Sequence, residues 1–119
     1  RAYDFTIPQE QIDVMNVAET HEALNERRAQ IGVVYMTDGK IPAYDLELLE
    51  DPKAVTSANY LTPVVSARAL EEEPRIRAVM EKIAAALDTE TSQDLHYRVD
   101  VVGQSVEQVA KYFISAKGI

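Results

Sequence analysis

The side chains of this sequence that could carry chemistry are two histidines, an excess of carboxylates and a set of aromatic rings. His21 and His96 lie far apart, and no HExxH pattern joins them, which argues against a histidine metal site. There is no cysteine, so neither a thiol nucleophile nor a thiolate metal site nor a disulfide is available. We therefore expect surface or packing roles for both histidines.

The carboxylates and glycines point to neither an enzyme nor a nucleotide site. Glu71, Glu72 and Glu73 form a run just before a predicted helix, where the helix dipole favours negative charge, and we interpret them as a solvated face. The four glycines are not clustered, and they form no GxGxxG, GxSxG or Walker A-type motif. No phosphate-binding loop and no cofactor are predicted.

The remaining chemical signal is aromatic, from six Tyr and two Phe. Tyr35, Tyr44 and Tyr60 all lie in one region around the turn signal Asp38–Gly39. Tyrosine favours strands, so composition alone leaves open whether these rings pack a sheet or line a site. Tyr35 stands where a β-branched apolar segment ends and the turn begins.

The elements that must position these residues alternate between strand-like and helix-like segments, which predicts an α/β architecture. The predicted strands are Gln11–Met15, Ile31–Tyr35, Tyr44–Leu49 and Pro63–Ser66. A helix over Ala18–Arg28 is expected to precede the second strand, which we predict to be buried. Asp38–Gly39 then predicts a tight turn, because glycine accepts backbone conformations that other residues avoid.

Three helices are predicted after residue 66. The clearest periodicity follows Pro74, a residue that suits a first helical turn. Its apolar stripe comprises Ile76, Val79, Met80, Ile83, Ala84 and Leu87. A further short helix is predicted to run through Leu95, with Thr89 or Thr91 as its cap.

The last helix carries the strongest end signals. Ser105 with Gln108 three residues later predicts a capping box at its start, and Gly118 suits its end. The predicted buried face comprises Val106, Val109, Ala110, Phe113 and Ile114. We therefore expect this helix to pack onto the rest of the domain.

Composition limits the classes of partner. A length of 119 residues allows one ordinary domain, and 12 Lys plus Arg against 20 Asp plus Glu give a formal net charge of -8. That charge opposes nucleic acid and anionic membrane surfaces. The apolar runs are far shorter than the roughly 20 residues that cross a bilayer. We expect a soluble chain, from which an export signal could have been removed.

Several motifs follow one another through the whole chain. They are GVVYMTDGKIPAYDLELL at 32–49, EDPK at 50–53, PVV at 63–65, DTET at 88–91 and RVDVVGQSVEQVAKYF at 98–113. In this order they resemble the substrate-binding protein of osmoprotectant ABC transporters, the family that binds glycine betaine, choline, carnitine and related quaternary ammonium compounds. No single motif would be specific, but the combination is.

The resemblance implies part of a type II periplasmic-binding-protein fold, also called a Venus flytrap: the end of the second lobe and the return into the first. About residues 1–62 would form a strand–helix–strand part of the second lobe, and about 63–119 a mainly helical part of the first. Family members are more than twice as long, so we expect a C-terminal fragment. Its uncovered apolar surface would favour a homodimer or a domain swap.

The same resemblance makes Tyr35 one wall of an aromatic ligand box. A trimethylammonium group is charged but has no N–H, so aromatic faces select it through their quadrupole, at about 0.5 to 2 kcal/mol per ring. Thr37 belongs to the same motif, although with Asp38 it can instead serve the turn itself. Met36 would add a soft apolar contact.

Two neighbouring residues are candidates for the second wall of the box. In the family pattern PPYxxxPVV, counting back from Pro63 places Asn59 rather than Tyr60 at the aromatic position. In an extended segment a one-residue offset sends a side chain to the opposite face, so the choice between the two stays open. If Asn59 lines the pocket, the site gains hydrogen bonding and loses one ring.

The resemblance implies an extracytoplasmic, non-enzymatic protein that binds a quaternary ammonium osmoprotectant and delivers it to an ABC transporter permease. An alternative is a ligand-sensing or interaction module of the same fold, fused to a permease or a regulator. A small α/β enzyme using carboxylates such as Asp38 and Asp45 is disfavoured, because no nucleophile–base pair accompanies them.

Overall fold

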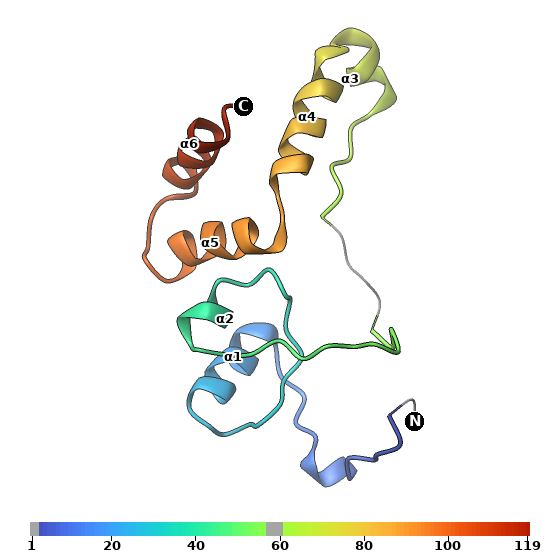
Figure 1. Cartoon of the computed structure of the whole chain (residues 1–119), viewed down its shortest axis with the longest axis vertical. Coiled ribbons are helices and arrows are strands. Elements are labelled where there is room, and N and C mark those ends of the chain that lie inside the picture. The colour runs from blue at the N-terminus through green and yellow to red at the C-terminus, as the bar shows by residue number, and fades with distance from the viewer. Residues whose placement is uncertain (1–2, 57–60) are drawn as a thin grey trace.

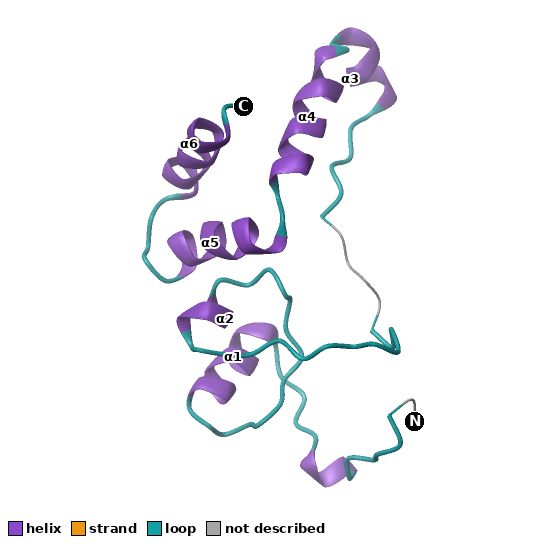
Figure 2. Ribbon diagram, viewed as in Figure 1, coloured by secondary structure: helices purple, strands orange, loops and turns teal. Residues whose placement is uncertain are grey.

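The computed structural model describes residues 3–56 and 61–119, and all regular elements in these ranges are helical (Figures 1 and 2). The short 3-10 helix η1 (Gln9–Gln11) is followed by α1 (Val17–Asn25), α2 (Lys40–Ala43), α3 (Ala67–Glu72), α4 (Arg75–Ala86), α5 (Thr89–Asp100) and α6 (Val106–Lys117). Helix α2 packs against α5, α5 against α6, and α3 against α4.

The predicted α/β architecture is wrong for the described residues, which form no strand and no sheet. The four segments predicted as strands lie in loops, apart from the overlap of the first with η1. Val33, in the strand predicted to be buried, is 85% exposed, and Val64, in the last predicted strand, is 92% exposed. The physical reason is that a strand exists only through backbone hydrogen bonds to a neighbour, whereas β-branched composition reports only that a side chain suits a pleated surface. These residues therefore do not form the sheet of a Venus flytrap lobe.

The chain is open and has a small core. Its radius of gyration is 18.1 Å, against about 13 to 14 Å for a compact domain of this length. Its accessible surface is 9719 Å², against about 6,500 Å² for a folded monomer of this mass. The buried apolar side chains of the described residues are Ala23, Ile41, Val109 and Phe113. Figure 1 shows α3 and α4 projecting at one end and η1 with α1 at the other.

Helix α1 confirms the predicted helix within a few residues. It begins at Asn16, whose side chain accepts a hydrogen bond from the Glu19 backbone N–H at 2.9 Å. The Glu19 carboxylate in turn accepts from the Asn16 N–H at 3.2 Å, which completes a capping box. The helix ends at Asn25, earlier than the expected Arg28, and it buries Thr20, His21 and Ala23.

The helices after Pro74 are present, with two corrections. Helix α4 follows Pro74 as predicted, and its apolar stripe is half-buried or exposed. The cap of α5 is Asp88, which accepts from the Thr91 N–H at 2.7 Å, so neither Thr89 nor Thr91 is the cap. Helix α5 also continues past Leu95 to Asp100.

Helix α6 confirms its predicted ends. Ser105 and Gln108 form the capping box, and Gly118 ends the helix in the left-handed region at φ 65°. Val109 and Phe113 are buried, whereas the other three members of the predicted face, Val106, Ala110 and Ile114, are exposed. In the part of the chain that the structure describes, no helix combines the length and apolar character needed to cross a membrane.

Candidate functional site

The residues of the predicted site that the structure describes lie in one turn, residues 35–39, called here the Tyr35 turn. The Asp38 N–H donates to the Tyr35 carbonyl at 3.0 Å, which confirms the predicted turn. The Asp38 carboxylate accepts from the Lys40 N–H at 3.1 Å, and its carbonyl from the Ile41 N–H at 3.2 Å. The turn therefore leads directly into α2 instead of a strand.

Helix α5 contacts the turn from one side. The Gln93 side-chain amide donates to the Met36 carbonyl at 2.7 Å, and His96 Nδ1 donates to the Thr37 carbonyl at 2.7 Å. Gly39 lies against the α5 backbone, where a Cβ would come within 2.1 Å of the Tyr97 nitrogen. These contacts join residues 57 and 59 positions apart, and sequence reasoning missed them because no local pattern marks such a pair.

Helix α1 contacts the other part of the turn. His21 is 1% exposed; its Nδ1 donates to the Val17 carbonyl at 2.8 Å. Its Nε2 lies 3.4 Å from the Asp38 carboxylate and has no hydrogen-bond partner. His21 is therefore a buried side chain between α1 and the turn rather than a surface residue.

A second α1 contact joins Glu22 to α2. The Glu22 carboxylate accepts from Lys40 Nζ at 2.9 Å and from the Tyr44 hydroxyl at 2.8 Å. The hydrogen bond from Lys40, and after it the one from Tyr44, lowers the pKa of the Glu22 carboxyl below its ordinary value. Glu22 in return raises the pKa of Lys40. The pairs fix the orientation of α2 immediately after the turn.

The Tyr35 ring differs from three other tyrosines of the described chain. Cations lie over Tyr3 (Lys53, 5.0 Å), Tyr44 (Lys40, 5.8 Å) and Tyr112 (Arg98, 4.0 Å). Tyr35 is 60% exposed, and among the described residues no cation lies over its ring. Met36 beside it is 55% exposed, and Thr37 is half-buried. Asn59 and Tyr60, the alternative second walls, lie outside the described residues.

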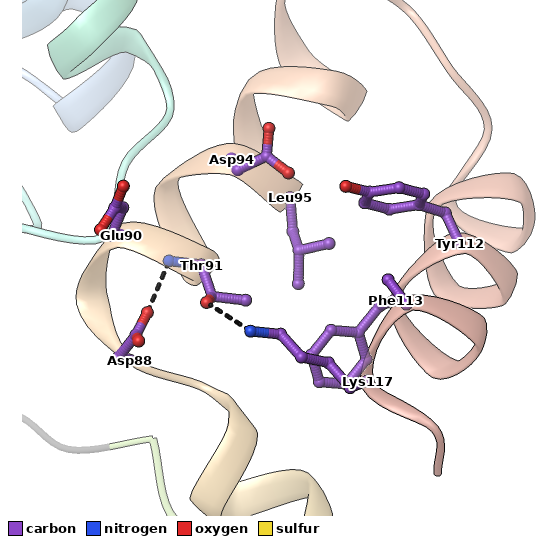
Figure 3. A pocket seen from close by; sticks show the side chains of 9 residues that line it. Asp88, Glu90, Thr91, Asp94, Leu95, Tyr112, Phe113 and Lys117 are labelled. Atoms are coloured by element: carbon purple, nitrogen blue, oxygen red, sulfur yellow. Dashed lines mark hydrogen bonds between the residues drawn. The ribbon is translucent and has the colours of Figure 1, made fainter.

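Two surface hollows lie elsewhere. The first, of about 380 Å³, lies between α5 and α6 (Figure 3) and is lined by Asp88, Glu90, Thr91, Asp94, Leu95, Tyr112, Phe113, Ala116 and Lys117. Several of its polar groups are paired. Lys117 donates to Thr91 at 3.3 Å, and Arg98, which also lies over the Tyr112 ring, donates to Asp94 at 2.8 Å. The second, of about 400 Å³, lies along the start of α4. Neither includes the Tyr35 turn.

The described residues contain no group of three or more histidine, aspartate or glutamate side chains suited to a metal ion. The Tyr35 turn presents an exposed aromatic ring and the exposed Met36 side chain, on a backbone that accepts hydrogen bonds from α5. An aromatic face of this kind attracts a cation that cannot donate hydrogen bonds.

Comparison with known proteins decides the family. Residues 1–116 match the family described as the substrate-binding domain of ABC-type glycine betaine transport systems. The chain belongs to this family. The resemblance read from the motifs is thereby confirmed, and because members of this glycine betaine-binding family are substrate-binding transport proteins, the chain is not an enzyme.

Three relatives named for different substrates are similar to this chain. A carnitine transport binding protein of Listeria monocytogenes is 28% identical over 120 residues, covering 95% of this chain and 38% of the relative. A glycine betaine-binding protein of Escherichia coli is 29% identical over 123 residues, covering 99% and 40%. An ergothioneine transport permease/ergothioneine binding protein of Helicobacter pylori is 31% identical over 86 residues, covering 72% and 16%. The chain thus spans about two fifths of the length of the first two.

Proposed function

We propose that this chain is the C-terminal portion of a longer extracytoplasmic protein that binds a quaternary ammonium osmoprotectant, of the glycine betaine, choline or carnitine class, and delivers it to an ABC transporter permease. Family membership and the substrates named for two relatives support this proposal. We also propose that the chain divides near residue 62 into a second-lobe part and a first-lobe part. Helices α3 to α6 lie in the second of these segments, and the contact of α2 with α5 joins the two.

The observation that carries the proposal is the Tyr35 ring, which is exposed and has no described cation over it, while the turn beneath it is hydrogen-bonded to Gln93 and His96 of α5. Because the backbone of the turn is held in place, Tyr35 loses little main-chain entropy when a methylated cation stacks on its ring. The formal net charge of -8 also favours the approach of cations over anions.

The other members of the proposed site are Met36, Thr37 and either Asn59 or Tyr60. Met36 is exposed beside Tyr35 and would contact ligand methyl groups through its thioether. For the second wall, Asn59→Ala and Tyr60→Ala are the deciding pair, because only the residue that faces the ligand should lower affinity when it is truncated.

The test of the proposed site is Tyr35→Ala in the full chain that its gene encodes, with binding of glycine betaine, choline and carnitine measured by calorimetry. Loss of one aromatic wall should weaken binding about tenfold or more. Tyr35→Phe keeps the ring and should bind within about threefold of the parent. The matched control is Tyr112→Ala, since Arg98 already covers that ring. Unchanged affinity of Tyr35→Ala would refute the proposed site.

A second candidate, a binding module fused to a permease, is favoured by the Helicobacter pylori relative, whose name joins the two activities in one protein. The neighbouring gene sequence discriminates the two: transmembrane segments in the same reading frame support the fusion, and a separate permease gene supports a separate binding protein.

The chain by itself is expected to self-associate, because large apolar side chains such as Val14, Leu49 and Leu61 are exposed on it. Light scattering of the isolated 119-residue chain tests this expectation. A monomeric mass at micromolar concentration would show that these side chains do not support a homodimer or a domain swap.

A further inference from the structure

We propose that Gln93 and His96 of α5 are positioning residues for ligand binding: they hold two successive carbonyl groups of the Tyr35 turn and so decide where the Tyr35 ring stands. This inference rests on the proposed function of Tyr35. It assigns to α5 a role in recognition that acts through the Tyr35 turn.

The two hydrogen bonds reach the residues that immediately follow Tyr35. Gln93 donates to the Met36 carbonyl and His96 to the Thr37 carbonyl, both at 2.7 Å. Residues three positions apart lie on one face of a helix, so one face of α5 presents both donors to two consecutive peptide units. The Asp38 N–H also holds the Tyr35 carbonyl, at 3.0 Å, so three successive carbonyl groups are anchored. The backbone that carries the Tyr35 ring therefore has little freedom to reorient.

The donor and the acceptor of both hydrogen bonds are fixed by their chemistry. A carbonyl oxygen only accepts, so the Gln93 side chain must present its amide nitrogen and His96 must carry a proton on Nδ1. Replacing either group by one that cannot donate therefore removes the bond outright. A carboxylate in place of the Gln93 amide would also repel the Met36 carbonyl.

Gly39 shows independently that α5 and the turn are built to lie in contact. Its φ of -68° and ψ of -15° are ordinary for any residue, so the backbone conformation does not require glycine here. The required feature is the close approach: an added Cβ would lie 2.1 Å from the Tyr97 nitrogen and 2.6 Å from the His96 carbonyl carbon.

The contacts from α1 cannot replace those from α5. His21 faces the Asp38 carboxylate, and Glu22 reaches Lys40 and Tyr44. The partners of these α1 side chains, Asp38, Lys40 and Tyr44, all come later in the chain than Met36 and Thr37. Among the described residues, the side-chain bonds to Met36 and Thr37 come from α5 alone.

The experiment measures glycine betaine affinity by calorimetry in the full chain that the gene encodes, together with the thermal midpoint. Gln93→Glu and His96→Leu each remove one donor and should weaken binding about tenfold. His96→Asn, whose amide nitrogen occupies nearly the place of Nδ1, should restore most of that affinity. The matched control is Gln11→Glu, the same change at an exposed site in η1, which should leave affinity unchanged.

A double-mutant cycle separates positioning from general stabilisation. In the Tyr35→Ala background, Gln93→Glu should cause no further loss of affinity, because it acts through the ring that is already absent. If Gln93→Glu lowers the thermal midpoint substantially, the comparison of His96→Leu with His96→Asn tests the positioning role instead, because neither variant introduces a negative charge.

The inference and the proposed function fail differently. If Tyr35→Ala weakens binding but Gln93→Glu and His96→Leu bind like the parent, or if their losses add fully to that of Tyr35→Ala, the positioning role is overturned and the binding site stands. If Tyr35→Ala binds like the parent, the proposed site itself is wrong, and the positioning role is overturned with it.

Discussion

Helix α6 and the Tyr35 turn are stabilised in opposite ways. The ends of α6 are set by neighbours in sequence, since Ser105 and Gln108 cap each other and Gly118 adopts the left-handed conformation that ends the helix. The Tyr35 turn has its own local bonds, but Gln93 and His96, more than fifty positions away, hydrogen-bond its carbonyl groups. The difference shows that the part of the chain with the clearest sequence signals is not the part on which proposed recognition depends.

The largest expected effect comes from breaking the contact between the turn and α5. In Gly39→Ala the new Cβ would lie within 2.6 Å of three backbone atoms of His96 and Tyr97, which cannot rotate away as a side chain can. We expect a loss of about 3 kcal/mol in the free energy of unfolding, together with the loss of both α5 hydrogen bonds to the turn. Urea unfolding of the full chain measures the loss.

The control for that substitution is Gly32→Ala. There the added Cβ would meet the Thr20 methyl at 2.6 Å and the Leu24 side chain at 3.0 Å, both of which are side-chain atoms that can shift. We expect a cost clearly smaller than that of Gly39→Ala, about 1 kcal/mol. Equal costs for the two variants would show that the approach of Gly39 to α5 is not specially close.

A smaller effect is expected when the local signal of α6 is removed. Ser105→Ala deletes the side chain that accepts from the Gln108 N–H at 3.2 Å, and it should cost about 1 kcal/mol of unfolding free energy. Ligand affinity should not change, because the described side-chain hydrogen bonds to the Met36 and Thr37 carbonyls come from α5 and not from α6. Ser115→Ala, an exposed position within the same helix, should cost nothing or add a few tenths of a kcal/mol. A drop in glycine betaine affinity with Ser105→Ala would show that ligand binding also depends on the cap of α6.

The smallest effect concerns the loop after Asp51, which combines local and remote contacts. The Thr56 backbone N–H, the Tyr3 hydroxyl and the Thr56 hydroxyl all donate to the Asp51 carboxylate and hold its pKa well below its usual range. Because the folded pKa is lowered, the stabilisation is complete above the ordinary aspartate value of about 3.9 and is lost as the pH falls through the folded value.

This titration is measurable by NMR on the Thr56 amide. The amide signal should stay constant from neutral pH down to about pH 4 and move only in stronger acid. In Asp51→Asn the acid-dependent change should disappear, since an amide does not titrate. A midpoint at or above the ordinary aspartate value in the parent would mean that the Thr56 and Tyr3 bonds do not persist in solution.

Much of the helical part of the chain could be predicted from sequence. Pro74 marked the start of α4, the Ser105–Gln108 pair marked the start of α6, and Gly118 marked its end. The cap of α5 was misplaced by one or three residues, because Asp88, Thr89 and Thr91 are all good cap residues and only the backbone conformation distinguishes them. The turn at Asp38–Gly39 was also predicted, although its continuation into α2 was not.

The strands and the environment of the site could not be predicted in the same way. Ile31–Tyr35 has the composition of a strand, but a strand also needs a neighbour, and in the described chain this segment has none. His21 was taken for a packing or surface residue on its type, and its position beside Asp38 became apparent only in three dimensions. Whether Asn59 or Tyr60 faces a ligand stays a prediction.

By itself the sequence determined the two ends of α6, the turn and the family, because each depends on residues close together along the chain or on the order of motifs. Only the tertiary structure decided which groups hold the Tyr35 turn, that Gly39 is needed for close approach rather than for its φ, and that the predicted strands remain unpaired in the described residues. The physical reason is that a hydrogen bond within four residues leaves a local pattern, whereas a carbonyl group accepts equally well from any donor that folding brings near it.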